Sequence, residues 1–288
     1  MKGSKKLREK LPNYQGKRIY RFILIVFLIA LSSITFQLVM DSLSRILLNN
    51  SILQILEPLT PIFGSLIIVI IGFLLVYSIW RNREKYVRNF GDLAYQKAFK
   101  FIVTGIPMVI SVIVHSFFPT DLIVSYGNNK NLSWYLGTPI SDIFFGFSMI
   151  FFIVRLCLWL IFVSLGLTVV LKSLKIFGID NMGLVYVYYP NESTLENHEI
   201  YSILRHPTYH SLMLLSIGSI FLRFSIYSVI FFFIFIVGIN IHLKFVEEKE
   251  LLQRFGEEYK TYKENVPAFL LRFKDLKKYF SFVFYKLR

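Results

Sequence analysis

The chain has 288 residues, of which 55% are hydrophobic, 17% aromatic and only 17% charged. Soluble domains carry about 25% charged residues, and a soluble core could not bury this much apolar surface. The composition therefore argues against a soluble enzyme and predicts an integral membrane protein. The net charge of +14 does not indicate a nucleic acid partner, because the Lys and Arg residues fall between hydrophobic runs and suit anionic lipid.

Six hydrophobic stretches approach the roughly 20 residues that a transmembrane helix needs. In chain order they are residues 22–40, 61–80, 101–118, 143–171, 209–222 and 226–243. The fourth is long enough to tilt or break, and the fifth is short. The sequence thus predicts an all-α, polytopic membrane helix bundle with about six transmembrane helices.

The positive charges alternate from one side of these spans to the other. Of the 32 Lys and Arg residues, 28 lie before span one, between spans two and three, between spans four and five, or after span six. By the positive-inside rule, both termini are expected in the cytoplasm. We expect a multi-pass protein of the cell membrane or endoplasmic reticulum, and a site formed by the polar stretches 195–209 and 247–267 would lie on its cytoplasmic face.

Three regions follow from this pattern. Residues 1–142 form an N-terminal three-helix membrane region without a motif. Residues 143–270 hold the other three spans and two polar stretches, whose motifs make this the expected catalytic region. Residues 271–288 mix Phe and Tyr with Lys and Arg, which is typical of an interfacial tail that contacts anionic lipid. The single cysteine, Cys157, excludes an intramolecular disulfide, and no paired His/Cys cluster predicts a metal site.

The first unusual polar stretch is residues 195–209, LENHEIYSILRHPTY. Pro207 disfavours helix at the residue before it and suits the first turn of the helix that follows. We therefore expect span five to begin there, with the positive end of its dipole available to a carboxylate or phosphate. Arg205 would add a fixed cation at the same place, and Tyr209 would lie on the first turn.

The second stretch is residues 247–267, EEKELLQRFGEEYKTYKENVP. It reads as a helix that continues out of span six, because Glu247, Leu251, Phe255 and Tyr259 recur every four residues. Glu247 and Glu248 could face a cationic ligand group. A helix start, two carboxylates and several aromatic rings together suit S-adenosylmethionine, which carries a zwitterion, a sulfonium and an aromatic base.

The two stretches together carry a resemblance. The pattern Y-x3-R-H-P-x-Y, a hydrophobic hairpin, and E-E-x2-L-x3-F-G-x2-Y-x2-Y-x3-V-P resembles the isoprenylcysteine carboxyl methyltransferase family and its phospholipid methyltransferase relatives. The resemblance covers roughly residues 195–267. It implies an S-adenosylmethionine-dependent membrane methyltransferase with a lipophilic acceptor, either a prenylcysteine carboxylate or lipid-like, that enters from the lipid side. The cofactor contacts that it implies are Leu195, Tyr201, His206, Pro207, Tyr209 and Glu247.

We expect Arg205, His206 and Glu248 to be the catalytic residues. An amine acceptor must lose a proton, and His206 or Glu248 could assist, whereas a carboxylate acceptor needs no base. The prenylcysteine enzymes have an Arg where this chain has Leu243. The neighbouring His242 and Lys244 are therefore candidate substrate contacts.

Arg155 is the third candidate substrate contact. It lies within span four, where a charge is costly and normally faces a partner or a cavity. It could therefore pair with Asp142 or line a substrate tunnel.

Two other functions remain open at this stage. An NADPH-dependent sterol-type membrane reductase resembles the family in its C-terminal region, but such proteins carry Asn-Tyr where this chain has Thr208 and Tyr209. A non-catalytic membrane protein is the second alternative. It is supported by Glu199 and Ser211, which replace glycines of the family pattern.

Overall fold

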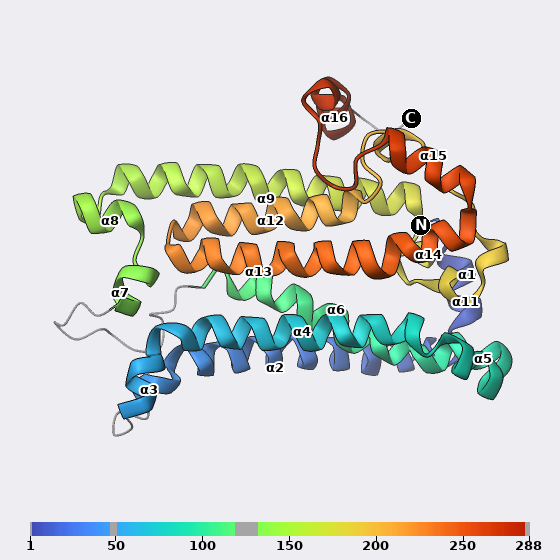
Figure 1. The fold of residues 1–288 in the computed structure, drawn as a ribbon, viewed down its shortest axis with the longest axis horizontal. Coiled ribbons are helices and arrows are strands. Elements are labelled where there is room, and N and C mark those ends of the chain that lie inside the picture. Colours follow the sequence, from blue (N-terminus) through green and yellow to red (C-terminus); the bar gives the residue numbers. More distant parts are fainter. Residues whose placement is uncertain (1, 47–50, 119–131, 286–288) are drawn as a thin grey trace.

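The structure is a computed structural model that describes residues 2–46, 51–118 and 132–285. These residues form helices joined by turns and loops, and no strand occurs among them. The long helices lie side by side with nearly parallel axes (Figure 1). The expected all-α membrane bundle is therefore confirmed.

Five helical stretches in the described part of the chain are long and apolar enough to cross a membrane: Arg18–Leu43, Glu57–Arg81, Arg83–His115, Met149–Phe177 and Ile226–Phe255. They correspond to the first four expected spans and the sixth. The expected fifth span is α12 (Pro207–Arg223), which has only 17 residues but lies alongside α9 and α13 (Figure 1). Six crossings and cytoplasmic termini stay predictions. The first and last described helices lie toward the same end of the bundle, as an even number of crossings requires.

The N-terminal half forms one layer of the bundle. Its long helices are α2 (Arg18–Ile46), α4 (Thr60–Arg81) and α6 (Ala94–His115). The shorter elements are α1 (Ser4–Lys10), η1 (Pro12–Tyr14), α3 (Ser51–Leu56), η2 (Glu57–Leu59), α5 (Arg83–Phe90) and η3 (Gly91–Leu93). A Cβ atom added to Gly105 would come within 2.7 Å of the Gly72 carbonyl oxygen. The two glycines thus allow α4 and α6 to cross closely.

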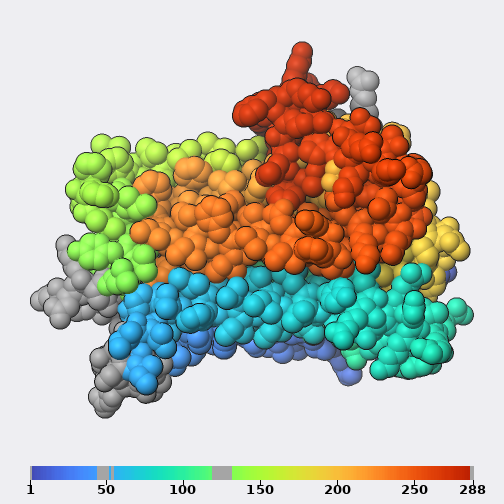
Figure 2. Space-filling model, viewed as in Figure 1, coloured from blue at the N-terminus to red at the C-terminus, as the bar shows by residue number. Residues whose placement is uncertain are grey.

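The second layer consists of α9 (Met149–Phe177), α12 and α13 (Ile226–His242). The short helices α7 (Leu132–Gly137) and α8 (Ile140–Phe145) precede it. A Cβ atom added to Gly166 on α9 would lie 3.0 Å from the carbonyl oxygen of Ser211 on α12. This layer rests directly on the N-terminal layer in the space-filling view (Figure 2).

Short elements gather at the end of the bundle that carries α1. Residues 178–206 connect α9 to α12 through α10 (Ile179–Met182), α11 (Val185–Tyr188), η4 (Pro190–Glu192) and η5 (Glu199–Ser202). A π-helical turn, Leu243–Glu247, carries α13 into α14 (Glu248–Phe255). The chain reverses at Gly256, whose φ is +58°. It then continues through α15 (Glu257–Asn265), η7 (Phe273–Asp275) and α16 (Leu276–Phe284).

Candidate functional site

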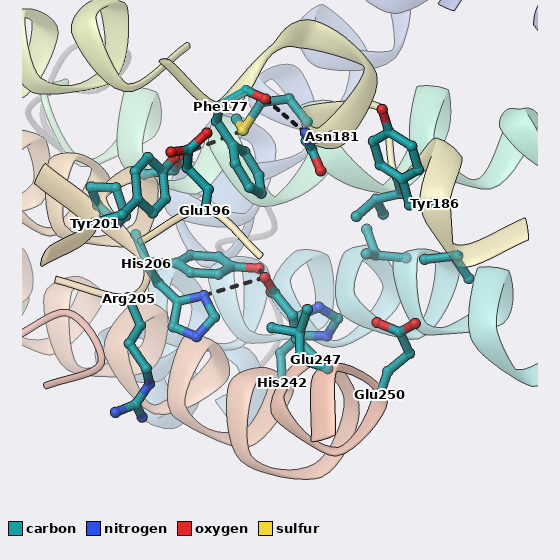
Figure 3. A pocket seen from close by; sticks show the side chains of 18 of the residues that line it. Phe177, Asn181, Tyr186, Glu196, Tyr201, Arg205, His206, His242, Glu247 and Glu250 are labelled. Carbon is teal, nitrogen blue, oxygen red and sulfur yellow. Dashed lines mark hydrogen bonds and ion pairs between the residues drawn. The ribbon is translucent and has the colours of Figure 1, made fainter. Parts of the chain in front are cut away.

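A cavity of about 320 Å³ lies at this end of the bundle (Figure 3). Its volume falls within the range of about 300–1,000 Å³ that is usual for small-molecule sites. The walls come from α4, α6, α9, α12, α13, the π-helical turn, α14, α15 and residues 178–206. The N-terminal region, for which the sequence indicated no role, therefore helps to build the same cavity as the C-terminal motifs.

The two polar stretches meet at the start of α12. Pro207 begins that helix as expected. The backbone N–H groups of Arg205 and His206 donate to the carbonyl oxygens of Pro267 (2.9 Å) and Ala268 (2.8 Å). These bonds hold the end of the first stretch against the end of the second, although more than fifty residues separate them in the sequence.

The polar end of the cavity is a hydrogen-bonded group of His206, Tyr209 and Glu247 (Figure 3). The Tyr209 hydroxyl donates to Glu247 Oε2 over 2.8 Å, and His206 Nδ1 lies 3.3 Å from Glu247 Oε1. On its other side, His206 Nε2 lies 3.4 Å from Glu248 Oε1. Burial lowers the pKa of His206, but the two carboxylates outweigh it and raise the pKa above its usual value. The imidazole therefore tends to carry a positive charge between two negative ones.

The π-helical turn explains why His242 and Glu247 face the same cavity. Residues five apart in a regular α-helix point about 140° away from each other, because each residue turns the helix by about 100°. The wider π turn brings positions i and i+5 nearly into line, and such turns are frequent at functional sites. His242 lines the cavity and packs against the rings of Phe73 and Trp80, each with a centroid separation of 5.4 Å.

The sequence predicted that Arg205 would offer a free cation at the start of α12, but in the structure its guanidinium is already bonded. Its Nε donates to Glu248 Oε1 over 3.1 Å, its Nη2 bonds the same oxygen, and its Nη1 donates to the carbonyl oxygens of Lys263 (2.8 Å) and Val266. In Figure 3 its guanidinium points away from His206 and Glu247. Glu248 also binds Lys263 Nζ at 2.7 Å and does not line the cavity. We call Arg205, Glu248, Lys263 and Val266 the Arg205 clamp.

One face of α14 completes the floor of the cavity. Glu250, Leu251, Arg254 and Phe255 line it together with Glu247. Glu250 and Arg254 form a two-bond ion pair at 2.8 and 2.6 Å. The four-residue repeat in the sequence predicted Leu251 and Phe255 but missed this pair. Glu250 and Arg254 follow Glu247 by three and seven residues, which places them on the same helix face as Glu247, and this spacing could have predicted the pair.

Residues 178–206 form the opposite wall. Leu195 and Tyr201 line the cavity as the resemblance implies, and Tyr201 stacks on Phe177 with a centroid separation of 5.1 Å. Asn181 and Glu196 also line it and were not predicted, because this irregular segment has no periodic pattern. Burial raises the pKa of the Tyr201 hydroxyl, so the group stays neutral.

Helix α1 holds this wall from outside. Lys6 and Lys10 are four residues apart on α1 and so share one face, while Lys2 lies just before the helix. Lys2 pairs with Glu196 at 2.9 Å, while Lys6 and Lys10 pair with Glu192 at 2.9 and 3.3 Å. The N-terminal segment thus binds a cavity-lining residue directly.

Two predicted substrate contacts lie away from the cavity. Arg155 is 3.7 Å from Asp142, so it takes the pairing that the sequence suggested, and it lies 22 residues or about 33 Å along α9 from Phe177. The side chain of Lys244 is exposed, with its amino group 5.4 Å from the Phe245 ring centre. Of the three candidates, only His242 lies at the cavity.

The structure thus describes a membrane helix bundle with a cavity at one end that is lined by both polar stretches. Residues 154–258 match the family model of phospholipid methyltransferases. The match confirms the family resemblance for this part of the chain, which contains the first motif and most of the second. It supports a membrane methyltransferase that acts on lipid-like substrates. No curated protein and no solved structure matches the chain.

Proposed function

We propose that this protein is an S-adenosylmethionine-dependent methyltransferase that acts on a lipophilic acceptor. The observation that carries the proposal is the shape of the cavity. Its polar end is built from His206, Tyr209 and Glu247, and its apolar part is lined by residues of α4 and α6, helices that are apolar enough to cross the membrane. A soluble cofactor and a lipid-like acceptor could reach one site from these two sides.

The residues present fit the cofactor. Glu196, Glu247 and Glu250 place three carboxylates on the wall, which suits a ligand with an ammonium and a sulfonium. The stacked rings of Phe177 and Tyr201 provide an aromatic surface. The residues that we assign to the cofactor are Leu195, Tyr201, His206, Pro207, Tyr209 and Glu247, all of which line the cavity. When bound, the cofactor would supply an electrophilic methyl group to the acceptor, with S-adenosylhomocysteine as the leaving group.

Charge at the cavity supports an amine acceptor over a prenylcysteine carboxylate. The two arginines at the wall are already paired, Arg205 with Glu248 and Arg254 with Glu250. An anionic acceptor would therefore meet glutamates without a compensating free cation among the described lining residues. An ammonium acceptor must lose a proton before attack, and Glu196 and Glu250 are the wall carboxylates that lie outside the cofactor assignment. The same charges oppose the phosphate groups of NADPH.

The Arg205 clamp supports a positioning role for Arg205 and Glu248. Glu248 faces Arg205, Lys263 and His206, so three cationic or potentially cationic groups weaken it as a base. We therefore assign these two residues to holding His206 in place.

Calorimetry on the purified protein in detergent tests the proposal, with S-adenosylmethionine and NADPH as separate titrants. We expect S-adenosylmethionine alone to bind. Glu247→Gln should weaken its binding by about 10- to 150-fold, since a hydrogen bond to a charged group contributes about 1.5–3 kcal/mol. Glu257→Gln on α15 is the matched control, because that side chain is 84% exposed. Unchanged affinity in Glu247→Gln would overturn the site, and binding of NADPH alone would reassign the protein to the reductases.

A further inference from the structure

Helix α16 lies across the bundle, and it is the candidate for an unassigned interaction surface. The spans run horizontally in Figure 1, whereas α16 is seen nearly end-on, so its axis lies roughly in the plane of a membrane that the spans cross. It projects from the rest of the protein in the space-filling view (Figure 2). Among the residues that the structure describes, no element covers its exposed sides.

One face of α16 is fixed to the bundle. Tyr279, Phe282 and Val283 are buried in a cluster that also contains Tyr201. Lys172 Nζ donates to the carbonyl oxygens of Phe282 (2.6 Å), Val283 (2.8 Å) and Tyr285 (2.7 Å) at the C-terminal end of the helix. Lys172 belongs to α9 and lies five residues before its end, so α16 sits level with the last turns of a span.

A second face is an exposed apolar stripe. Leu276, Phe280 and Phe284 follow one another at intervals of four residues, which places them on one side of α16, and Phe273 of the preceding η7 adds a fourth exposed apolar side chain. Phe273 is 91% exposed and Phe284 is 72% exposed. Such rings are costly in water, and at this depth the hydrocarbon boundary is the surface that would cover them.

A third face is cationic. Lys277 and Lys278 of α16 are exposed, as is Lys274 of η7, and on α16 the two lysines lie between the apolar stripe and the buried face. An apolar stripe beside a row of lysines, on a helix lying in the membrane plane, is the pattern of a helix that binds anionic lipid.

We propose that α16 docks on anionic phospholipid of the leaflet at this end of the bundle, and that this docking supports the ligand cavity. Anionic lipid is the occupant that the lysine row favours. The apolar stripe would enter the acyl boundary while the lysines contact headgroup phosphates. A docked α16 would hold in place the segment before it, which contains Ala268, the backbone partner of His206.

The coupling runs through that segment. His210 Nδ1 donates to the carbonyl oxygen of Phe269 over 2.8 Å, and the Tyr279 hydroxyl bonds His210 Nε2 over 3.1 Å. The neighbouring Ala268 carbonyl accepts from the backbone N–H of His206. A displacement of α16 would therefore pull on the same residues that position His206 at the cavity.

The location of α16 is tested in lipid nanodiscs that contain phosphatidylglycerol. In a Cys157→Ser background, a fluorophore is attached at Phe280→Cys on the apolar stripe or at Lys278→Cys on the cationic face. Nitroxide groups on the lipid acyl chains should quench the first label strongly and the second weakly. Equal, weak quenching at both positions would overturn the proposal and indicate a water-exposed or protein-covered helix. This measurement does not depend on the proposed function.

The coupling rests on the proposed function and is tested separately by S-adenosylmethionine affinity in nanodiscs with and without phosphatidylglycerol. Each lysine near an anionic surface contributes roughly fivefold to the attraction. We expect anionic lipid to tighten cofactor binding in the native protein but not in the variant with Lys274, Lys277 and Lys278 all changed to Gln. Lys260→Gln, an exposed lysine on α15, is the control. If the S-adenosylmethionine affinity of the native protein is the same with and without phosphatidylglycerol, the coupling is refuted. If S-adenosylmethionine does not bind under either condition, the proposed function is refuted instead.

Discussion

Replacing Arg205 by alanine distinguishes two roles for this residue: a structural role in the Arg205 clamp and direct contact with the ligand. The change removes two bonds to Glu248 and one each to the carbonyl oxygens of Lys263 and Val266. Loss of one partner from a buried ion pair costs about 3–5 kcal/mol, because the other charge is stranded. Glu248 keeps Lys263 as a partner, so we expect about 3 kcal/mol. For a chain of this size that corresponds to a drop of roughly 6–12 °C in melting temperature.

The assay is thermal unfolding in detergent followed by intrinsic fluorescence. Lys260→Ala is the control, because its exposed pair with Glu257 should contribute about 0–1 kcal/mol. The double variant Arg205→Ala/Glu248→Gln should lose less than the sum of the single changes, since no charge is then stranded. If Arg205→Ala has the same melting temperature as the control and yet loses S-adenosylmethionine binding, the guanidinium contacts the ligand. The structural role of the clamp is then refuted.

Two further predictions follow from charge. Because its pKa is raised in the folded protein, charged His206 stabilises the fold fully below pH about 6.5, and this contribution disappears as the pH rises through the raised pKa. The melting-temperature gap between the native protein and His206→Gln should therefore narrow with rising pH, and a constant gap would contradict the assignment. At the outer wall, Lys6→Gln/Lys10→Gln should speed cleavage after Glu192 by a glutamate-specific protease, because both partners of that carboxylate are lost. The exposed Lys5→Gln is the control, and equal cleavage rates would show that α1 does not hold the wall.

Most of the fold could be predicted because hydrophobic length is a local signal. Five of the six expected spans coincide with long helices. The start of α12 at Pro207 was also predicted, since proline restricts the backbone on both sides of itself. The π-helical turn Leu243–Glu247 was not predicted, because one additional residue in a turn leaves no mark on an apolar pattern. That turn nevertheless decides that His242 faces the cavity.

The site could be predicted only where polar stretches with a recognisable motif stand at the ends of apolar spans. His206, Tyr209 and Glu247 belong to the two polar stretches, and the structure brings them together. The partners of Arg205 could not be foreseen, because two of them are backbone carbonyls whose position depends on the reversal at Gly256. The contribution of α4 and α6 was also hidden. Their cavity-lining residues have the same apolar chemistry as their lipid-facing neighbours, and only the packing of the two layers distinguishes them.

The contribution of α4 is tested by Trp80→Ala. Trp80 lines the cavity and contacts His242, so its loss should enlarge the apolar part while the residues assigned to the cofactor stay in place. If this part receives the acceptor, the KM for the acceptor should rise about tenfold with little change in kcat or in S-adenosylmethionine affinity, as expected when binding energy common to ground state and transition state is removed. Tyr77→Ala is the matched control, because Tyr77 lies on the same helix but is exposed and does not line the cavity. A loss of cofactor affinity at unchanged acceptor KM would instead place the cofactor against α4, and the acceptor would have to enter by another wall.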